Sequence, residues 1–395
     1  MGSKLKVALA YSGGLDTSIA IRLLQKEYDA DVITVSVNVG QGAAELKEAA
    51  KKAEQLGAIK HYEIDAVREF VEKYVFKCIK ANGLYEGYPL STAIARYPIA
   101  SKLVEVAKKE KADAVAHGCT GKGNDQFRFE TTIALKAPDM KIIAPIRELN
   151  IDRKRGIEYA KKHGIPIPVD IDRPYSIDEN LWGRSIEGGI LENPEHPPPE
   201  EIYAWTKSPD ETPPKPRVIG IAFECGIPVA LDGKRLEGPK LIARLNKIAG
   251  EHGVGRIEII EDRILGLKAR ENYEAPAATV LILAHKALEQ LVLTKEELAF
   301  KQIVDQTWAD LAYRGLWFDP LREDLDAFID ETQKRVTGTV KVELHRGNAR
   351  VVARSSPYSL YEEELVSFER FGFDQREVAG VLKFHGLQGK ILRKK

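Results

Sequence analysis

The stretch that decides the fold reads Ser12-Gly13-Gly14-Leu15-Asp16-Thr17-Ser18, and it follows an apolar run over residues 5–11. The apolar run predicts a strand and the residues after the glycines predict a helix, so hydroxyls and glycines surround a helix N-terminus. Glycines let the backbone turn sharply and approach an oxyanion, while free amides and the helix dipole attract its charge. We therefore expect a phosphate site. A plain strand-to-helix turn capped by Ser or Asp is the alternative.

Two common nucleotide motifs do not occur. The sequence contains neither the Walker motif G-x-x-x-x-G-K-[ST] nor the dinucleotide motif G-x-G-x-x-G. The nearest approach to a Walker motif is Gly118-Cys119-Thr120-Gly121-Lys122-Gly123. It has too few residues between its glycines, and a glycine stands where the Mg²⁺-binding hydroxyl belongs. Phosphate binding is therefore expected at the first glycine turn.

Length and composition restrict the class of protein. A chain of 395 residues predicts two domains and leaves room for an appended tail. Lys plus Arg equals Asp plus Glu at 59 each, so a nucleic-acid or anionic-membrane partner is not expected. Cys78, Cys119 and Cys225 lack metal-binding spacing and indicate reduced cytosolic thiols. With no apolar run near 20 residues and no signal peptide, we expect a cytoplasmic enzyme for small substrates.

The first part of the chain alternates strand and helix patterns up to about residue 165. This rhythm predicts a doubly wound parallel sheet, which binds ligands beyond the carboxyl ends of its strands. Three polar, glycine-rich loops should converge there: residues 12–18, 40–42 and 118–125. The expected strands cover residues 5–11, 32–39, 61–64, 112–117 and 141–144, and the expected helices cover residues 19–28, 43–56, 68–82 and 98–109.

The second part of the chain has a different pattern. The proline-rich residues 194–216 predict a long surface excursion. Short strand patterns then mix with helices, which indicates an α+β domain. From Leu360 onward, apolar residues at helical spacing predict an amphipathic arm that docks on another subunit, with a core-packed terminal helix as the alternative. The expected strands cover residues 218–223, 256–260, 340–344 and 350–353, with helices around Leu241, Leu283, Leu298 and Leu325.

Residues 116–130 combine a glycine loop with an amide, a carboxylate and a guanidinium. An amino-acid ligand needs an acceptor for its ammonium and donors for its carboxylate, and Asp125 with Thr120, Asn124 and Arg128 offers both. A glycine turn with helix-capping Asn and Asp is the alternative. His117 ends a predicted strand, where a structural role is more common than that of a general base.

Two motifs carry a family resemblance. The glycine turn resembles the SGGxD signature of the ATP pyrophosphatases, which cleave ATP between its α and β phosphates. The form SGGLDTS and the stretch HGCTGKGNDQFRFE, residues 117–130, are similar to blocks of the argininosuccinate synthase family. Similar blocks recur from residue 5 to about residue 318, and again at residues 335–338 and 374–375. The residues 84–96 match a family block but are one residue shorter.

The resemblance implies a ligase of arginine biosynthesis. Such an enzyme joins L-citrulline to L-aspartate through a citrullyl-adenylate and releases AMP and pyrophosphate from ATP. It implies Mg²⁺, a homotetramer and no covalent nucleophile. The domains expected on this basis are a nucleotide-binding domain over residues 1–168, a synthetase domain over residues 169–360 and a helical oligomerisation arm over residues 361–395.

The resemblance also implies ligand contacts, with the metal ligands left open apart from a plausible role for Asp16. The residues implied for ATP are Ala10, Tyr11, Ser12, Gly13, Gly14, Leu15, Asp16, Thr17, Ser18, Val37 and Gly118. Those implied for aspartate are Thr120, Asn124 and Asp125. Those implied for citrulline are Tyr88, Thr92, Asn124, Arg128, Ser176, Ser185, Glu261 and Tyr273.

Three rival functions predict other features. An RNA-modifying sulfurtransferase predicts reactive cysteines and a basic surface, and a glutamine-dependent amidotransferase predicts a cysteine nucleophile in a glutaminase domain. The sequence displays none of these. A non-catalytic ATP-binding regulator would be expected to lack the polar residues of one loop, whereas all of them are present.

Overall fold

The computed structural model describes residues 4–166, 175–370 and 372–395. Its first part is a parallel five-stranded sheet in the order β3-β2-β1-β6-β7. The order reverses at β1 and β6, which is the switch point of a doubly wound fold. The strands are β1 (Leu5–Ala10), β2 (Ala30–Asn38), β3 (Lys60–Asp65), β6 (Ala114–Ala116) and β7 (Lys141–Ile143).

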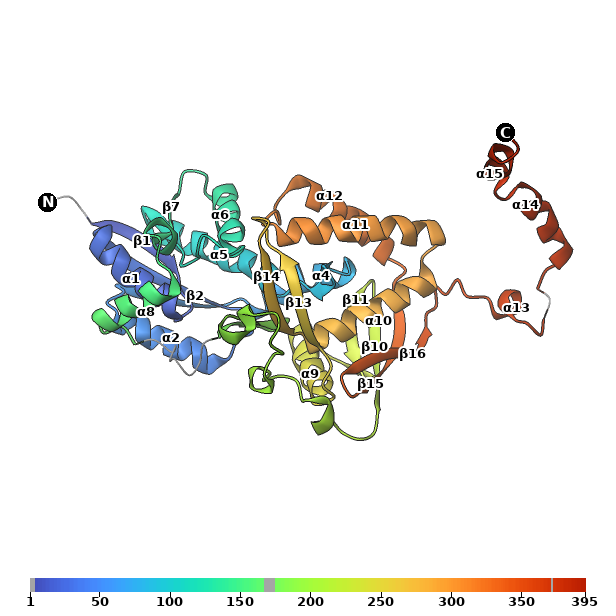
Figure 1. The fold of residues 1–395 in the computed structure, drawn as a ribbon, viewed down its shortest axis with the longest axis horizontal. Coiled ribbons are helices and arrows are strands. Elements are labelled where there is room, and N and C mark those ends of the chain that lie inside the picture. Colours follow the sequence, from blue (N-terminus) through green and yellow to red (C-terminus); the bar gives the residue numbers. More distant parts are fainter. Residues whose placement is uncertain (1–3, 167–174, 371) are drawn as a thin grey trace.

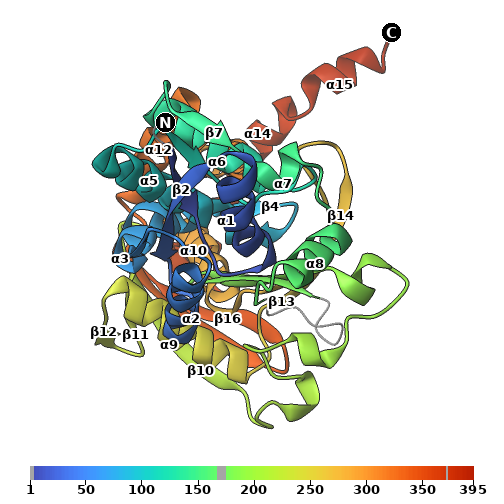
Figure 2. The ribbon, with the colours of Figure 1, turned by 90° about the vertical axis from the view of Figure 1, so that its left-hand side faces the viewer.

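Helices cover both faces of this sheet (Figures 1 and 2). Val7 and Leu9 of β1 face a core shared with α1, α2 and α8, whereas Ala8 and Ala10 face a core shared with α5. This alternation of a fully buried strand confirms the predicted doubly wound architecture. The helices are α1 (Leu15–Glu27), α2 (Ala43–Gln55), α5 (Thr92–Glu110), α6 (Asp125–Lys136), α7 (Pro145–Glu148) and α8 (Arg153–Lys162).

Two predicted helices differ in detail. The helix expected to begin at Pro98 begins at Thr92, so the predicted start is wrong and Pro98 lies inside α5. A proline there removes one backbone hydrogen bond, but Tyr97 and Ala100 beside it are fully buried, and this packing offsets the loss. The helix expected over residues 68–82 consists of α3 (Val67–Phe70), a π-helical segment (Val71–Val75) and α4 (Phe76–Lys80).

The second part contains two antiparallel sheets and long helices, as the α+β prediction requires. One sheet has the order β13-β14-β9-β8 and the other has the order β12-β11-β10-β15-β16. The first comprises β8 (Ser176–Asn180), β9 (Gly183–Glu187), β13 (Arg256–Asp262) and β14 (Lys268–Glu274). The second comprises β10 (Arg217–Glu224), β11 (Ile227–Leu231), β12 (Lys234–Arg235), β15 (Gly338–His345) and β16 (Asn348–Ser355).

Of the long helices of this part, α9 and α10 pack on the second sheet and on each other, and α11 packs on α12. They are α9 (Gly238–Glu251), α10 (Pro276–Val292), α11 (Lys295–Tyr313) and α12 (Pro320–Gln333). The proline-rich excursion holds short 3₁₀ turns at Glu200–Ile202 and Pro209–Glu211, and another lies just before it at Gly189–Glu192. Among the described residues, no helix is long and apolar enough to cross a bilayer.

A short hairpin links the two parts. It comprises β4 (Leu84–Tyr85) and β5 (Tyr88–Pro89), and the Tyr85 hydroxyl donates to the Asp262 carbonyl at the end of β13 over 2.8 Å. One hydrophobic core runs from the first sheet into the second part. The expected boundary between residues 168 and 169 falls in the stretch 167–174, which lies outside the described residues.

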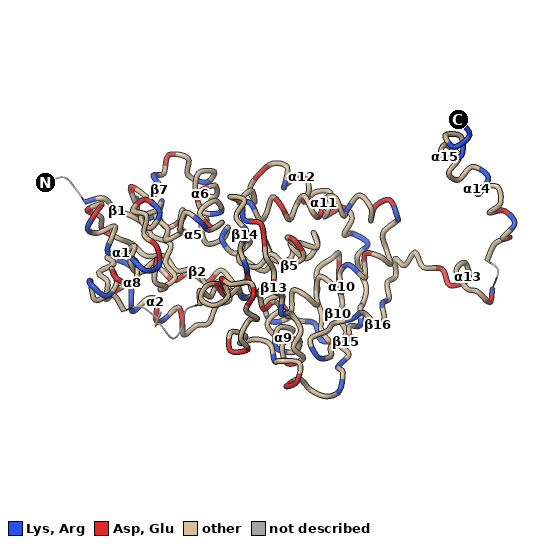
Figure 3. The backbone as a smooth tube through the Cα atoms, in the orientation of Figure 1, with Lys and Arg blue, Asp and Glu red and all other residues tan. Residues whose placement is uncertain are grey.

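The C-terminal arm stands away from the rest of the chain (Figure 1). It contains α13 (Glu363–Val366), α14 (Val378–Phe384) and α15 (Leu387–Leu392). Lys and Arg are interspersed with Asp and Glu along the whole backbone trace, and the arm ends on a basic tip (Figure 3). Large apolar side chains of the arm are exposed, including Leu365, Phe368, Val381, Leu382, Phe384 and Leu392.

Candidate active site

The glycine turn follows β1 directly and opens α1. Gly13 has a φ of +78°, which favours glycine, and Gly14 is the N-cap residue of α1. Among the described residues no side chain caps this helix, so the alternative of a Ser- or Asp-capped turn is wrong. The first amides of α1 are therefore available to a ligand, and the positive end of the helix dipole favours an anion there.

The hydroxyls of this loop have two different roles. The Ser12 and Thr17 hydroxyls are 3.2 Å apart at the exposed side of the turn. Ser18 is fully buried, and its hydroxyl donates to the Gly13 carbonyl over 3.3 Å. The Ser12 and Thr17 hydroxyls can thus contact a ligand, whereas the buried Ser18 hydroxyl stabilises the turn through the Gly13 carbonyl. Behind the loop, the apolar residues Ala10, Tyr11, Leu15 and Val37 are buried.

The Asp16 carboxyl lies in the first turn of α1. Burial raises its pKa above the ordinary value, and the nearby Arg153 opposes the shift. Among the described residues no lysine or arginine forms an ion pair with it within 4.0 Å. A half-buried carboxylate with no close cation, beside the Thr17 hydroxyl, offers the hard oxygen ligands that Mg²⁺ prefers.

Two of the three polar loops, those that follow β1 and β6, meet as predicted. A Cβ placed on Gly118 would lie 3.0 Å from the Thr17 side chain, so the loops after β1 and β6 are in contact. A Cβ on Gly13 would lie 2.9 Å from that of Ala49 in α2, the helix that follows the loop at residues 40–42. Glycine at position 118 thus permits the close approach of the two loops, and glycine at position 13 permits that of the glycine turn to α2.

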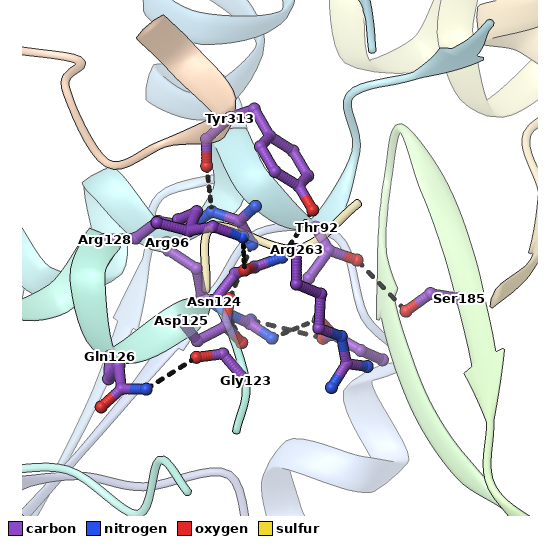
Figure 4. Close-up of polar contacts among 12 residues, drawn as sticks. Thr92, Arg96, Gly123, Asn124, Asp125, Gln126, Arg128, Ser185, Arg263 and Tyr313 are labelled. Carbon is purple, nitrogen blue, oxygen red and sulfur yellow. Dashed lines mark hydrogen bonds and ion pairs between the residues drawn. The ribbon is translucent and has the colours of Figure 1, made fainter. Parts of the chain in front are cut away.

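Asp125, the first residue of α6, lies between two guanidinium groups (Figure 4). Arg96 Nε is 2.8 Å from one of its oxygens, and Arg128 Nη1 is 2.9 Å from the other. Arg96 also forms an ion pair with Asp178 of β8. Burial alone would raise the pKa of Asp125, but Arg96 and Arg128 outweigh it, and the net pKa is lowered. The Asp125 carboxylate is therefore held ionised.

Asp178 has the opposite balance. Burial raises its pKa, Arg96 opposes that shift, and the negative charge of Asp125 adds to it. Two carboxylates that share one guanidinium therefore differ in their affinity for a proton.

A second cluster joins the two parts of the chain around Glu261, which is 3% exposed. The Tyr88 hydroxyl donates to one carboxylate oxygen over 2.5 Å, and the Tyr313 hydroxyl donates to the other over 2.9 Å. Asn124 donates to the Tyr313 hydroxyl over 2.7 Å. The rings of Tyr88 and Tyr273 are stacked with centroids 4.4 Å apart. Burial, with Tyr273 and Glu261 adjacent, raises the pKa of Tyr88 far above its usual range, so its phenol remains a donor.

Most of the residues implied for citrulline are brought together. Besides Tyr88, Glu261, Tyr273 and Asn124, the Thr92 and Ser185 hydroxyls lie 3.2 Å apart across the two parts (Figure 4). Arg128 donates to the Tyr313 carbonyl over 2.9 Å, which ties it to the same cluster. Ser176 and Thr120 are instead exposed, on β8 and in the loop before α6.

His117 and Cys119 have structural environments. The buried His117 ring lies 3.1 Å from a Glu130 oxygen through Nε2, and its Nδ1 accepts the Cys119 amide over 3.3 Å. Both ring nitrogens are thus engaged, which supports the structural interpretation of this histidine. Burial raises the pKa of the Cys119 thiol, with Asp125 contributing, so the thiolate needed for nucleophilic chemistry is disfavoured.

The sequence did not single out Arg96, Asp178 or Tyr313. Arg96 and Asp178 lie in the stretches that resemble the family, but their ion pair spans 82 positions. Tyr313 is the last residue of α11, where its spacing is that of a core aromatic. A signal could have come from Arg96, which is the one charged residue in positions 92–101 of α5, since buried charges require partners.

Comparison with known proteins shows which family the chain resembles. Residues 6–166 match the arginosuccinate synthase N-terminal HUP domain, and residues 175–392 match the arginosuccinate synthase C-terminal domain. The argininosuccinate synthase of Methanocaldococcus jannaschii is 63% identical over 389 residues, covering 98% of each chain. The chain belongs to the argininosuccinate synthase family. The enzymes of Methanococcus maripaludis and Archaeoglobus fulgidus are 57% and 58% identical and cover 99% of this chain.

Argininosuccinate synthases are carbon-nitrogen ligases, and this chain is an enzyme of that class. Its reaction joins citrulline to aspartate with ATP as the third substrate, in arginine biosynthesis. Among solved structures, a predicted subunit of tRNA methyltransferase from M. jannaschii is 21% identical. It covers 40% of this chain and 74% of its own, with a TM-score of 0.29.

Proposed function

We propose that the argininosuccinate synthase reaction of this chain takes place at the carboxyl ends of β1 and β6, between the glycine turn and the Glu261 cluster. The observation that carries this proposal is the contact between two loops. The uncapped N-terminus of α1 lies against the loop that leads to Asp125. A triphosphate on the first loop and an amino acid at the second would then be adjacent.

ATP would bind with its β and γ phosphates on the glycine turn. The free amides of α1 and the Ser12 and Thr17 hydroxyls are donors suited to phosphate oxygens. Asp16, with Thr17, would hold Mg²⁺, which would neutralise the charge of the departing pyrophosphate. The half-buried carboxylate of Asp16, which has no ion pair within 4.0 Å among the described residues, supports this assignment.

Citrulline would bind at the Glu261 cluster. Its ureido group is neutral and its other end is a zwitterion, so the pocket must offer both aromatic surface and charge. The stacked Tyr88 and Tyr273 rings, the Glu261 carboxylate and the Arg128 guanidinium have this character. Thr92 and Ser185 add a hydroxyl from each part of the chain, and the exposed Ser176 would contact the ligand from β8.

Aspartate would bind beside Asp125, with Asn124 and Thr120 as further contacts. The ionised Asp125 carboxylate suits the ammonium of an amino acid, and it is already oriented by Arg96 and Arg128. The ureido oxygen of citrulline would attack the α phosphorus to form a citrullyl-adenylate, and the aspartate amine would then displace AMP. The chain contributes position and charge, and no side chain forms a covalent bond.

We further propose that the enzyme is a cytoplasmic homotetramer and that the arm over residues 361–395 docks on another subunit. The exposed apolar side chains of α14 and α15 support this, because water is a poor environment for such a surface.

An assay of pyrophosphate release tests the proposed reaction. We expect AMP and pyrophosphate to appear in equal amounts, and only when ATP, citrulline and aspartate are all present. Release of ADP and orthophosphate, or turnover that is independent of either amino acid, would contradict the proposal.

A further inference from the structure

Lys52 is a buried lysine that the reaction described above leaves without a role. It lies on α2, only 6% of its surface is exposed, and among the described residues no carboxylate lies within 4.0 Å of its ammonium. A buried charge usually has an ionic partner, because desolvation is costly. Burial lowers the pKa of Lys52, and Glu48 on the same helix opposes that shift. Lys52 is therefore a buried positive charge whose close contact is with the backbone.

The contact that Lys52 does make is with the glycine turn. Its Nζ donates to the Gly13 carbonyl over 2.8 Å, and the buried Ser18 hydroxyl donates to the same oxygen over 3.3 Å. One carbonyl is thus held by two donors from two helices. Gly13 itself lies close to Ala49, one turn before Lys52, so the glycine turn is packed against α2.

The orientation of this carbonyl determines where the next amide points. In a planar trans peptide the C=O and N–H bonds point in opposite directions. Because the Gly13 oxygen faces Lys52, the Gly14 N–H faces away from α2. That N–H meets the Ser12 hydroxyl at 3.4 Å, which is a long contact that an oxyanion can replace.

We propose that Lys52 is a positioning residue for the departing pyrophosphate. It fixes the Gly13–Gly14 peptide with its amide toward the phosphates, and it supplies a buried positive charge behind the turn. This inference rests on the proposed function, because it requires pyrophosphate in that loop. A donor that is oriented before the reaction stabilises developing charge without a further cost of reorganisation.

Three variants test the proposal. Lys52→Met removes the charge and keeps the length of the side chain, Lys52→Arg keeps the charge, and Lys51→Met is the matched control, because Lys51 is exposed on the same helix. The measurements are the citrulline-dependent exchange of labelled pyrophosphate into ATP, and the affinity for pyrophosphate by calorimetry. The thermal midpoint and the KM values for citrulline and aspartate are recorded in parallel.

For Lys52→Met we expect exchange to slow and pyrophosphate affinity to fall by about tenfold or more, the scale for a hydrogen bond from a charged group. The two amino-acid KM values should change less than twofold. Lys52→Arg should recover most of the loss, and Lys51→Met should behave as the wild type.

Two results would overturn the inference. One is a Lys52→Met enzyme with unchanged exchange and pyrophosphate affinity. The other is a Lys52→Met enzyme in which the affinities for all three substrates and the thermal midpoint fall together, while Lys52→Arg restores none of them. A wild type that binds pyrophosphate but shows no citrulline-dependent exchange would instead contradict the proposed function, and the calorimetric comparison would still test Lys52.

Discussion

Asp125 illustrates how a single side chain acquires its chemistry from its neighbours. Alone, a buried carboxyl would tend to keep its proton, but two guanidinium groups at 2.8 and 2.9 Å hold it ionised. The same contacts fix both of its oxygens in place. An ionised, immobile acceptor is what the recognition of an ammonium group requires.

Replacing Asp125 by Asn should therefore affect one substrate selectively. We expect the KM for aspartate to rise at least about tenfold, because a charge-assisted hydrogen bond is lost, while the KM for ATP changes less than twofold. Steady-state kinetics with each substrate varied in turn measures this. Asp139→Asn, at an exposed position after α6, is the control. Equal losses for aspartate and ATP would refute the role given to Asp125.

Asp305 is a residue whose ionisation opposes stability. It lies in a buried cluster with Lys301, Glu289 and Asn82 beside a cavity of about 300 Å³. Burial raises its pKa from 3.8 to about 6, with Glu289 adding to the shift and Lys301 opposing it. Between pH 4 and 6 the folded state thus binds this proton more tightly than the unfolded state does, and the free energy of unfolding falls as the pH rises.

The Asp305→Asn variant should lack this dependence. A shift of about two pKa units corresponds to about 3 kcal/mol. Between pH 4 and 7, the free energy of unfolding of the variant should therefore rise by roughly that much relative to that of the wild type. Urea unfolding at several pH values measures the difference. Asp310→Asn, on the exposed face of the same helix, is the control. A stability difference that stays constant over this range would show that Asp305 does not titrate as described.

At the scale of elements, the approach of β2 to the β8–β9 turn joins the two parts. The Leu181 amide donates to the Val39 carbonyl over 3.0 Å. Gly40 has a φ of +107°, and a Cβ there would lie 2.5 Å from that of Leu181. The contact therefore depends on glycine both for its backbone conformation and for its lack of a side chain.

Gly40→Ala should accordingly lower the thermal midpoint, with a cost of about 1–3 kcal/mol from strain and overpacking. Gly42→Ala is the matched control two residues later, because a Cβ there meets nothing within 4 Å. Gly42 is the N-cap residue of α2, where alanine is less favourable than glycine, so this change should cost less than about 1 kcal/mol. Differential scanning calorimetry compares the two, and an equal effect of both changes would contradict the packing argument.

At the scale of the whole molecule, the arm is the part that the rest of the chain does not cover. Phe368, Val381, Leu382 and Phe384 are each more than half exposed. Single exposed apolar residues are ordinary, but a connected series on an extended segment marks a surface for association. A second copy of this chain is the partner proposed for it.

Deletion of residues 361–395 tests this directly. We expect the shortened chain to keep the circular dichroism of a folded protein and to have a smaller mass in solution than the full chain, as measured by light scattering. The arm contributes little to the chain's own core, so the thermal unfolding of each subunit should remain cooperative. An unchanged mass after the deletion would rule out the arm as the oligomerisation element.

The local structures of this chain follow from residues that are neighbours in the sequence. The apolar run before Ser12-Gly13-Gly14 predicts a strand, and the residues after the glycines predict a helix with a tight turn between them. Both can be predicted locally, because glycine conformations and helix ends depend on neighbouring residues. The same holds for the rhythm of strands and helices, and thus for the doubly wound sheet and the α+β second part. The start of α5 at Thr92 escaped prediction, because burial around Pro98 outweighed the local preference of proline.

Which distant groups meet depends on the packing of the whole chain. Tyr88 and Glu261 are 173 positions apart, and Lys52 lies 39 positions from the Gly13 carbonyl that it holds. No local pattern encodes such pairs, because they result from how helices and sheets pack and from the cost of burying a charge without a partner. The ionisation of Asp125 and the orientation of the glycine turn therefore belong to the folded molecule.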